Sequence, residues 1–291
     1  MIMRESEISD LGIVVGGKNI TDFRFADDTV LPAWTEAHLQ DMLNKVVKIS
    51  DKYGPKMNIK KTKVMKVSKM YDGKTNSNRP TNQQNINLNI NGEKLEEVTC
   101  FQYLGSLVIS DGRCNTEIKS RIGKAKTQFG KLKTFLCNTK INMDVRKRML
   151  QCYVWPVLLY GAEAWTLNED MKRGLRAFEM CYRRMMKISW ISKICNNRVL
   201  DMARTQRMLM TNIMRRKARY CGHMTRHSDF LKLLLEGKIE GTRARGRQRR
   251  TWLDDLCGWT KIKNKCTLLN CCKYKQRWKT LASNLHDGDG T

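Results

Sequence analysis

Short segments of alternating apolar and polar residues occupy much of the first 110 residues. They are bounded by glycines or by the turn pair Asn91-Gly92, and they are rich in β-branched and aromatic side chains. This pattern predicts short strands joined by tight turns. We place these strands and hairpins at residues 13–17, 20–31, 64–67, 86–98 and 101–109.

Helical spacing of apolar residues occurs once in this part of the chain and dominates from Asn115 onward. Thr35 predicts the N-cap of the first helix, and Gly54-Pro55 predicts its end. The expected inward positions of this helix are Leu39, Met42, Leu43, Val46, Ile49 and Tyr53. The apolar stripe that follows Asn115 is Ile118, Ile122, Ala125, Phe129, Leu132 and Leu136. Further helices are predicted over 143–165, with a kink at Pro156, over 169–188 and over 198–226.

The change of periodicity near residue 112 predicts an α+β fold. Residues 1–112 are expected to form a small antiparallel sheet with a helix. A mostly α-helical region is expected over 113–190, followed by a basic helical C-terminal region over 191–291.

Charge is distributed unevenly along the chain. The 291 residues include 55 Lys+Arg and 28 Asp+Glu, a formal net charge of +27. Residues 1–110 hold only 15 and 13 of these, so residues 111–291 hold a net charge of +25. This asymmetry indicates a polyanionic partner, and we expect nucleic acid, whether RNA, DNA or a hybrid. The alternative is a solvated basic surface without a partner.

Apolar runs and cysteines indicate the compartment. No apolar run reaches the length of about 18 residues that a membrane span requires, so we expect no membrane partner. Eleven irregularly spaced cysteines predict reduced thiols, and hence an intracellular protein, nuclear or cytoplasmic. Cys221, His223 and His227 are a candidate zinc set, with Cys257, Cys266, Cys271 or Cys272 as a further ligand, although the spacing matches no standard zinc pattern. Buried apolar cysteines are the alternative.

Two adjacent carboxylates, Asp27 and Asp28, fall at the tip of the hairpin predicted over residues 20–31. Neighbouring carboxylates repel each other, and a divalent metal ion removes that cost. Polymerases use such a site, in which two metal ions activate the primer hydroxyl and stabilise the leaving pyrophosphate. A polar turn without metal is the alternative, because Asp is common in turns.

The surroundings of these carboxylates resemble a known family. Phe25-Ala26-Asp27-Asp28 resembles the active-site hairpin of reverse transcriptases. Residues 54–63 and 101–106 resemble the next palm motif and the primer grip of non-LTR retrotransposon enzymes, most closely those of the RTE/BovB type. Similar segments continue at residues 156–165, 222–226, 237–241, 252–254 and 277–278. The ordered matches cover nearly the whole chain and imply an RNA-directed DNA polymerase.

This resemblance implies a fold and a role for individual residues. Residues 1–112 become a partial palm, and the helix from Asn115 becomes part of the thumb. Asp27 and Asp28 become catalytic carboxylates that hold Mg²⁺ or Mn²⁺. The remaining implied roles are nucleotide phosphate contact for Lys61 and Lys63, primer-grip positions for Phe101, Tyr103, Leu104 and Gly105, and duplex contact for Lys119, Lys126 and Lys133.

Only 24 residues precede Phe25. In the family, the fingers, the nucleotide-gating motif and a third metal-binding Asp lie far upstream of this hairpin. We therefore expect residues 1–291 alone to be catalytically incomplete while still binding nucleic acid. The alternatives are a stand-alone nucleic-acid-binding or interaction protein derived from such an element, and a non-functional gene fragment.

Five arginines lie within eight positions near the C-terminal end: Arg243, Arg245, Arg247, Arg249 and Arg250. We expect them to contact phosphates in a salt-dependent manner that is largely independent of sequence. A basic loop or a nuclear-import signal is the alternative. Trp252 and Trp259 follow the cluster, and their spacing of seven suits either stacking on bases or one core-facing side of a helix.

Overall fold

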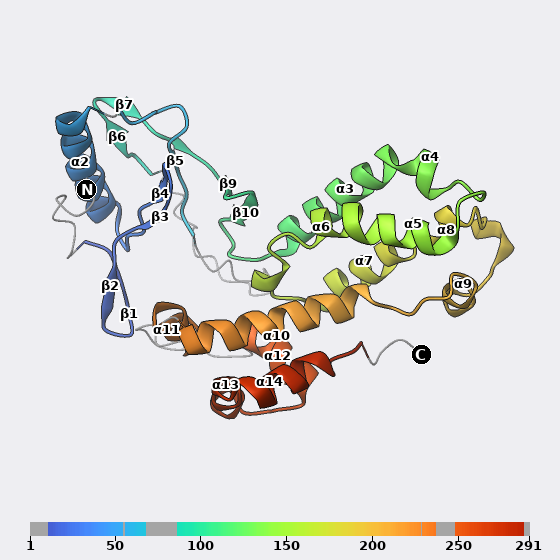
Figure 1. The fold of residues 1–291 in the computed structure, drawn as a ribbon. Helices are drawn as coiled ribbons and strands as arrows, with labels where there is room; N and C mark the ends of the chain where they lie inside the picture. The colour runs from blue at the N-terminus through green and yellow to red at the C-terminus, as the bar shows by residue number, and fades with distance from the viewer. Residues whose placement is uncertain (1–10, 55, 68–85, 228, 237–247, 288–291) are drawn as a thin grey trace, which may run out of the picture. The chain divides into compact units, whose positions relative to one another are not determined.

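The computed structural model describes residues 11–54, 56–67, 86–227, 229–236 and 248–287 (Figure 1). The chain forms two compact units. The N-terminal unit comprises residues 1–112 and 233–246, and the C-terminal unit comprises residues 113–232 and 247–291. Each unit is described below by itself.

The strands of the N-terminal unit pair two by two, whereas we expected one small antiparallel sheet. The antiparallel pairs are β1 (Ile13–Val15) with β2 (Lys18–Ile20), β3 (Phe23–Phe25) with β4 (Asp28–Val30), β6 (Asn89–Ile90) with β7 (Glu93–Lys94), and β9 (Cys100–Tyr103) with β10 (Ser106–Ile109). β5 (Lys63–Val64) pairs in parallel with β8 (Glu96–Glu97). The strands are only two to four residues long, and β7 and β8 consist wholly of charged residues, so neither can cover a hydrophobic face.

Two-residue turns close all four antiparallel hairpins, and three of these turns have the same backbone conformation. Both turn residues have positive φ: Gly16 and Gly17, Asn91 and Gly92, and Leu104 and Gly105. Positive φ at both positions gives the backbone twist that matches two antiparallel strands, and Gly and Asn adopt it at little cost. The hairpin predicted at Asn91-Gly92 is thereby confirmed, and so is the turn predicted after the strand at Gly16-Gly17.

Helix α2 (Glu36–Tyr53) begins where the sequence predicts it, because the Thr35 side chain accepts a hydrogen bond of 3.2 Å from the backbone N–H of His38. Gly54 ends the helix with φ of 94°. Its buried apolar residues are Met42, Leu43 and Val46. The expected inward position of Tyr53 is wrong: this last helical residue is 40% exposed.

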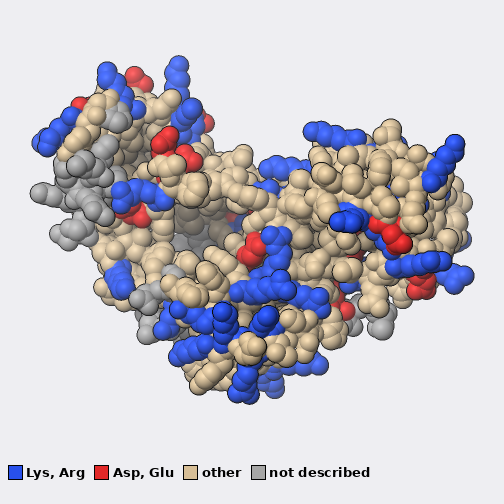
Figure 2. Space-filling model, viewed as in Figure 1, with Lys and Arg blue, Asp and Glu red and all other residues tan. Residues whose placement is uncertain are grey.

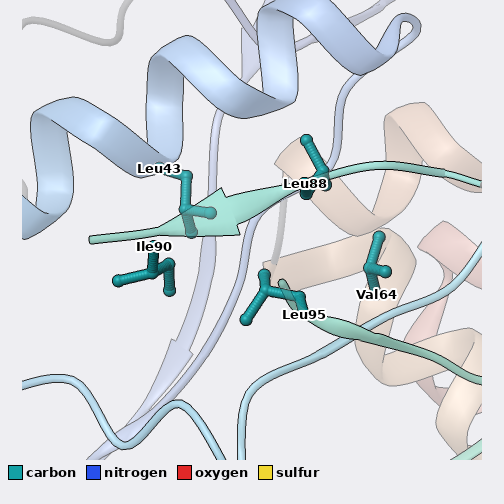
Figure 3. Packing of buried hydrophobic residues seen from close by; sticks show 5 residues of the cluster. All are labelled: Leu43, Val64, Leu88, Ile90 and Leu95. Carbon is teal, nitrogen blue, oxygen red and sulfur yellow. The ribbon is translucent and has the colours of Figure 1, made fainter. Parts of the chain in front are cut away.

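The core of the N-terminal unit gathers apolar side chains from α2 and from strand segments distant in sequence. Leu43, Val64, Leu88, Ile90 and Leu95 converge there (Figure 3). The backbone around this core is fixed by Gln40, whose amide accepts from the N–H of Asn89 at 2.9 Å and donates to its carbonyl at 2.8 Å. The core therefore fastens β6 to α2.

The C-terminal unit is helical. In chain order, the helices after residue 112 are α3 (Asn115–Lys131), α4 (Lys133–Leu136), α5 (Met143–Met149), the π-helix η1 (Leu150–Val154), α6 (Trp155–Leu158), the 3₁₀ helix η2 (Ala162–Ala164), α7 (Glu169–Glu179), α8 (Tyr182–Met185), the 3₁₀ helix η3 (Trp190–Ser192), α9 (Asn196–Met202), α10 (Leu209–His227), α11 (Asp229–Glu236), α12 (Trp252–Thr260), α13 (Lys265–Lys273) and α14 (Lys275–Ser283). Helix α10 packs against α7, η2, α12, α13 and α14.

Several predicted helices are divided. The segment 143–165 is divided into α5, η1, α6 and η2, because Pro156 lacks an N–H and the preceding turn widens into a π-helix. The segment 169–188 is divided into α7 and α8, and the segment 198–226 is divided into α9 and α10, with residues 203–208 between them. The long stripe from Ile118 breaks at Leu132, between α3 and α4. Among the described helices, none is both long and apolar enough to cross a membrane.

Candidate nucleic-acid interface

The hairpin of β3 and β4 presents the two adjacent carboxylates as predicted. Phe25 pairs with Asp28, so Ala26 and Asp27 form the turn, and Ala26 has φ of 50°. Asp27 and Asp28 are both exposed. Their position at a hairpin tip is confirmed, while their catalytic role stays a prediction.

The carboxylate oxygens of Asp27 and Asp28 are ligands of the type that Mg²⁺ or Mn²⁺ prefers, but two carboxylates are too few for a two-metal site. Within the described part of the chain, no group of three or more His, Cys, Asp or Glu side chains lies close enough to hold a metal ion. Asp22 lies before β3, away from the hairpin tip in the strand register, and its Oδ2 lies 2.5 Å from the Nε of Arg24. The described residues therefore do not form a complete two-metal site.

Lys61 and Lys63 follow the turn after α2. Asn58 shapes this turn, since its carbonyl accepts from the N–H groups of Lys61 and Thr62 at 3.1 and 2.9 Å. The Lys61 side chain is exposed, which suits a phosphate contact. Lys63 lies in β5 and forms an ion pair with Glu96 of the neighbouring β8. A phosphate at Lys63 must compete with that carboxylate.

The four primer-grip-like residues lie on one hairpin. Phe101 and Tyr103 belong to β9 and are half-buried, while Leu104 and Gly105 form the turn into β10. Leu104 is 38% exposed and has φ of 47°, an unusual conformation for a branched residue. The hairpin thus displays an apolar tip, whose contact with a primer stays a prediction.

The three lysines predicted to contact a duplex are all exposed. Lys119 and Lys126 are seven residues apart on α3, and Lys133 begins α4. The buried residues Ile118, Ala125 and Phe129 face the core from the same helix, so the lysines lie on its solvated side.

The structure describes only two of the five arginines in the cluster. Arg243, Arg245 and Arg247 lie outside the described residues. Arg249 and Arg250 are exposed, and the Nε of Arg250 donates a hydrogen bond of 2.7 Å to Asp255 in α12. One arginine of the cluster is therefore held by a carboxylate of the protein itself.

Trp252 and Trp259 lie around a buried cation. The Lys217 ammonium of α10 lies 4.8 Å from the Trp252 ring centroid and 5.5 Å from that of Trp259. The indole of Trp252 also donates to the carbonyl of Glu163 at 2.8 Å. Both rings are half-buried, so the geometry favours core positions over stacking on bases.

Lys217 and Asp255 form a buried ion pair, and both side chains have 0% exposure. The lysine Nζ lies 2.5 Å from the aspartate Oδ2 and donates to the carbonyl of Trp165 at 2.7 Å. The same oxygen of Asp255 accepts from the N–H of Leu167 at 3.0 Å. Burial lowers the pKa of Lys217 from its ordinary value, while the Asp255 carboxylate opposes that shift. This network joins α10, α12 and the segment after η2.

The candidate zinc set does not assemble among the residues that the structure describes. Cys221 is fully buried, and its sulfur lies 3.6 Å from that of Cys272. His223 and His227 are exposed, with ring centroids 4.8 Å apart. None of the eleven cysteines forms a disulfide, as the sequence predicts. The hydrogen bond with Cys221 and burial raise the pKa of the Cys272 thiol, which favours the neutral form of an apolar side chain.

Within the predicted basic C-terminal region, a basic surface on α13, α14 and the loop before α13 was not singled out from the sequence, although the signal is plain. Residues 256–286 contain no Asp or Glu. The exposed cations of this segment include Lys261, Lys263, Lys273, Lys275, Arg277 and Lys279, which we call the C-terminal basic surface. Figure 2 shows Lys and Arg gathering over this region of the C-terminal unit. Tyr274 lies within the surface and is 65% exposed.

Comparison with known proteins gives one informative match. Over 258 residues, the chain is 27% identical to an uncharacterized transposon-derived protein of Caenorhabditis elegans. The alignment covers 83% of this chain and 86% of that protein. No family model and no solved structure matches the chain. The similarity supports an origin of this protein in a transposable element.

Proposed function

We propose that the chain is part of the RNA-directed DNA polymerase of a non-LTR retrotransposon of the RTE/BovB type, and that its C-terminal unit binds nucleic acid. The transposon-derived relative supports the origin, and the ordered motifs from Phe25 to Trp278 support the polymerase. In this proposal, the N-terminal unit is the end of a palm. The helices that follow are a thumb and a basic tail.

The observation that supports nucleic-acid binding best is the C-terminal basic surface. Besides Lys265, which pairs with Asp254, six exposed cations lie on a segment of 31 residues that contains no carboxylate. Cations without neighbouring carboxylates are available to phosphates, and each contact releases counterions from the nucleic acid. Tyr274 lies between Lys273 and Lys275 and offers an exposed ring to a base.

Salt dependence of binding tests this proposal. The full chain should bind a fluorescent oligonucleotide with an affinity that falls as salt rises. Replacing Lys273, Lys275, Arg277 and Lys279 by Ala should reduce the slope of log K against log salt by about 3, since each phosphate contact adds about 0.7–0.9. A matched variant replaces Lys18, Lys48, Lys60 and Lys66 by Ala, four exposed cations of the N-terminal unit.

Equal loss of slope in the two variants would show that only net charge matters and would contradict the assignment of the basic surface. Absence of binding by the native chain would contradict the proposed function itself.

We further propose that residues 1–291 do not polymerise on their own. Asp27 and Asp28 supply two carboxylates, and Asp22, which precedes the same hairpin in the sequence, is engaged by Arg24. Lys61 remains an exposed candidate for phosphate contact. Primer extension with Mg²⁺ or Mn²⁺ should give no template-dependent product. Synthesis that Asp27→Ala abolishes would overturn this statement.

A second candidate function is that of a stand-alone nucleic-acid-binding protein derived from such an element. The compactness of the C-terminal unit favours it, because α7, η2, α12, α13 and α14 pack around α10 as in a domain with its own core. Cooperative unfolding of the full chain, together with salt-sensitive binding and no polymerase activity, would support this candidate. Aggregation of the full chain on expression would contradict it.

A further inference from the structure

A loop of the C-terminal unit exposes two large apolar side chains next to each other. Trp190 is 78% exposed and Ile191 is 88% exposed, and both belong to η3, between α8 and α9. Single exposed apolar residues are ordinary, but adjacent large ones indicate an interaction site. The retrotransposon motifs assign no role to this loop.

Hydrogen bonds fix the backbone of the loop. Ser189 accepts a bond of 3.3 Å at its Oγ from the N–H of Ile191, and its carbonyl accepts from the Ser192 hydroxyl at 2.6 Å. Lys193 then ends η3 in the left-handed conformation, with φ of 49°. The loop is therefore shaped before any partner arrives, which lowers the entropy cost of binding.

Arg183 fixes the ring of Trp190. Its guanidinium carbon lies 5.0 Å from the ring centroid of Trp190, and the residue is only 8% exposed. The guanidinium itself is held by the carbonyl of Ile194 and by the side chain of Asn196, the latter at 3.3 and 3.4 Å. A cation anchored in this way orients the indole while leaving most of it in solvent.

The surroundings of the two apolar residues are basic. Residues 180–200 contain no Asp or Glu. The exposed cations nearest in sequence are Arg184, Lys187, Lys193 and Arg198. A planar aromatic ring among unopposed cations matches a strand that offers planar bases and phosphates.

We propose that Trp190 stacks on an unpaired base of a bound nucleic-acid strand. Ile191 covers the edge of that base, while Lys187 and Lys193 contact the flanking phosphates. This inference rests on the proposed nucleic-acid binding and adds to it a base-contacting residue, on a loop outside the C-terminal basic surface.

The test compares two 20-nucleotide probes, a single-stranded oligonucleotide and an abasic strand of the same length. Trp190→Ala in the full chain should weaken binding to the first by about 5- to 100-fold, because stacking on an aromatic ring contributes that much per base. Binding to the abasic strand and the salt slope should stay unchanged, since no phosphate contact is removed. Trp190→Phe should restore most of the affinity. Trp34→Ala, which removes another exposed tryptophan (64%), is the matched control and should behave like the native chain.

Intrinsic fluorescence provides a second measurement that does not depend on the alanine variant. Binding of the oligonucleotide should quench tryptophan emission in the native chain and quench it less in Trp190→Phe. Equal affinity of the native chain and Trp190→Ala for the base-containing probe would overturn this inference alone. An equal loss on both probes would also overturn it. A native chain that binds neither probe overturns both this inference and the proposed function.

Discussion

The Lys217–Asp255 pair makes the C-terminal unit sensitive to a change of one atom. Asp255→Asn keeps the size of the side chain but replaces one carboxylate oxygen with an NH₂ group. In the native protein both oxygens accept hydrogen bonds, Oδ2 from Lys217 and Leu167 and Oδ1 from Arg250. In either orientation of the amide that replaces the Asp255 carboxylate, its NH₂ group points at one of the N–H donors that the carboxylate accepted from, so one hydrogen bond is replaced by a contact between two donors.

The magnitude follows from burial. With 0% exposure, the Lys217 ammonium cannot recover hydration when the carboxylate is lost. Breaking such a pair at one partner costs about 3–5 kcal/mol of unfolding free energy. For a domain of this size, each kcal/mol corresponds to about 2–4 °C in Tm, so Asp255→Asn should lower Tm by about 6–20 °C.

Urea and thermal unfolding, followed by tryptophan fluorescence and circular dichroism, measure this loss. The control is Asp170→Asn, which breaks an ion pair with Arg173 in which the side chains are 66% and 76% exposed. Exposed pairs contribute only about 0–1 kcal/mol. Adding Lys217→Met to Asp255→Asn should recover part of the loss, because it removes the uncompensated charge. A loss in Asp255→Asn no larger than that in Asp170→Asn would refute the reasoning.

Two further predictions concern α7 and α10. Gly222→Ala should lower the unfolding free energy by about 1–3 kcal/mol, because its Cβ would lie 2.4 Å from the Trp278 ring. Gly258→Ala in α12 meets open space and should instead raise the unfolding free energy by about 0.5–1 kcal/mol, which chemical denaturation measures. Burial raises the pKa of Glu179, so the folded state binds more protons than the unfolded state above the ordinary Glu range of about 4.3. The free energy of unfolding should therefore fall as pH rises through the raised pKa of Glu179. In urea titrations at a series of pH values, Glu179→Gln should make this fall smaller. The control Glu169→Gln changes an exposed carboxyl and should leave the fall as it is in the native protein. An unchanged pH profile in Glu179→Gln would show that this carboxyl does not set the dependence.

The hairpins could be predicted because the information that specifies them is local. Gly16-Gly17 and Asn91-Gly92 combine residues that tolerate positive φ with flanking apolar alternation. The tip at Asp27 and Asp28 follows from the same pattern. The pairing of β5 with β8 could not be predicted, because it joins residues 33 apart and neither strand has an alternating pattern.

The interruptions of the helices escaped prediction for a different reason. Apolar spacing continues across Leu132 and from Glu179 to Tyr182, so periodicity alone indicates continuous helices. Glu179 instead accepts hydrogen bonds from the N–H groups of Met208 and Leu209 at 2.6 and 2.8 Å, and so caps α10 from a distant segment. Such a cap is set by tertiary contact.

The role of individual Lys and Arg residues could not be predicted from the sequence either. Lys217 lies among the arginines of α10 and has the composition of a solvated face, yet it is fully buried because Asp255 lies opposite it. Conversely, the cations of the C-terminal basic surface, on α13, α14 and the loop before α13, are exposed. Counting charges along the sequence identified the basic region, but it could not distinguish cations that are buried in ion pairs from cations that are exposed to solvent.

The partners of Lys217 also set the order in which the protein can mature on the ribosome. Asp255 follows Lys217 by 38 residues. At a synthesis rate of about 5–20 residues per second, the lysine waits about 2–8 seconds for its carboxylate to be made. During that interval, α10 cannot bury the side that carries Lys217 without leaving the lysine charge buried and unpaired. Closure of the C-terminal unit is therefore a late event in translation, and a chain that stops before α12 leaves α10 with its central lysine unpaired.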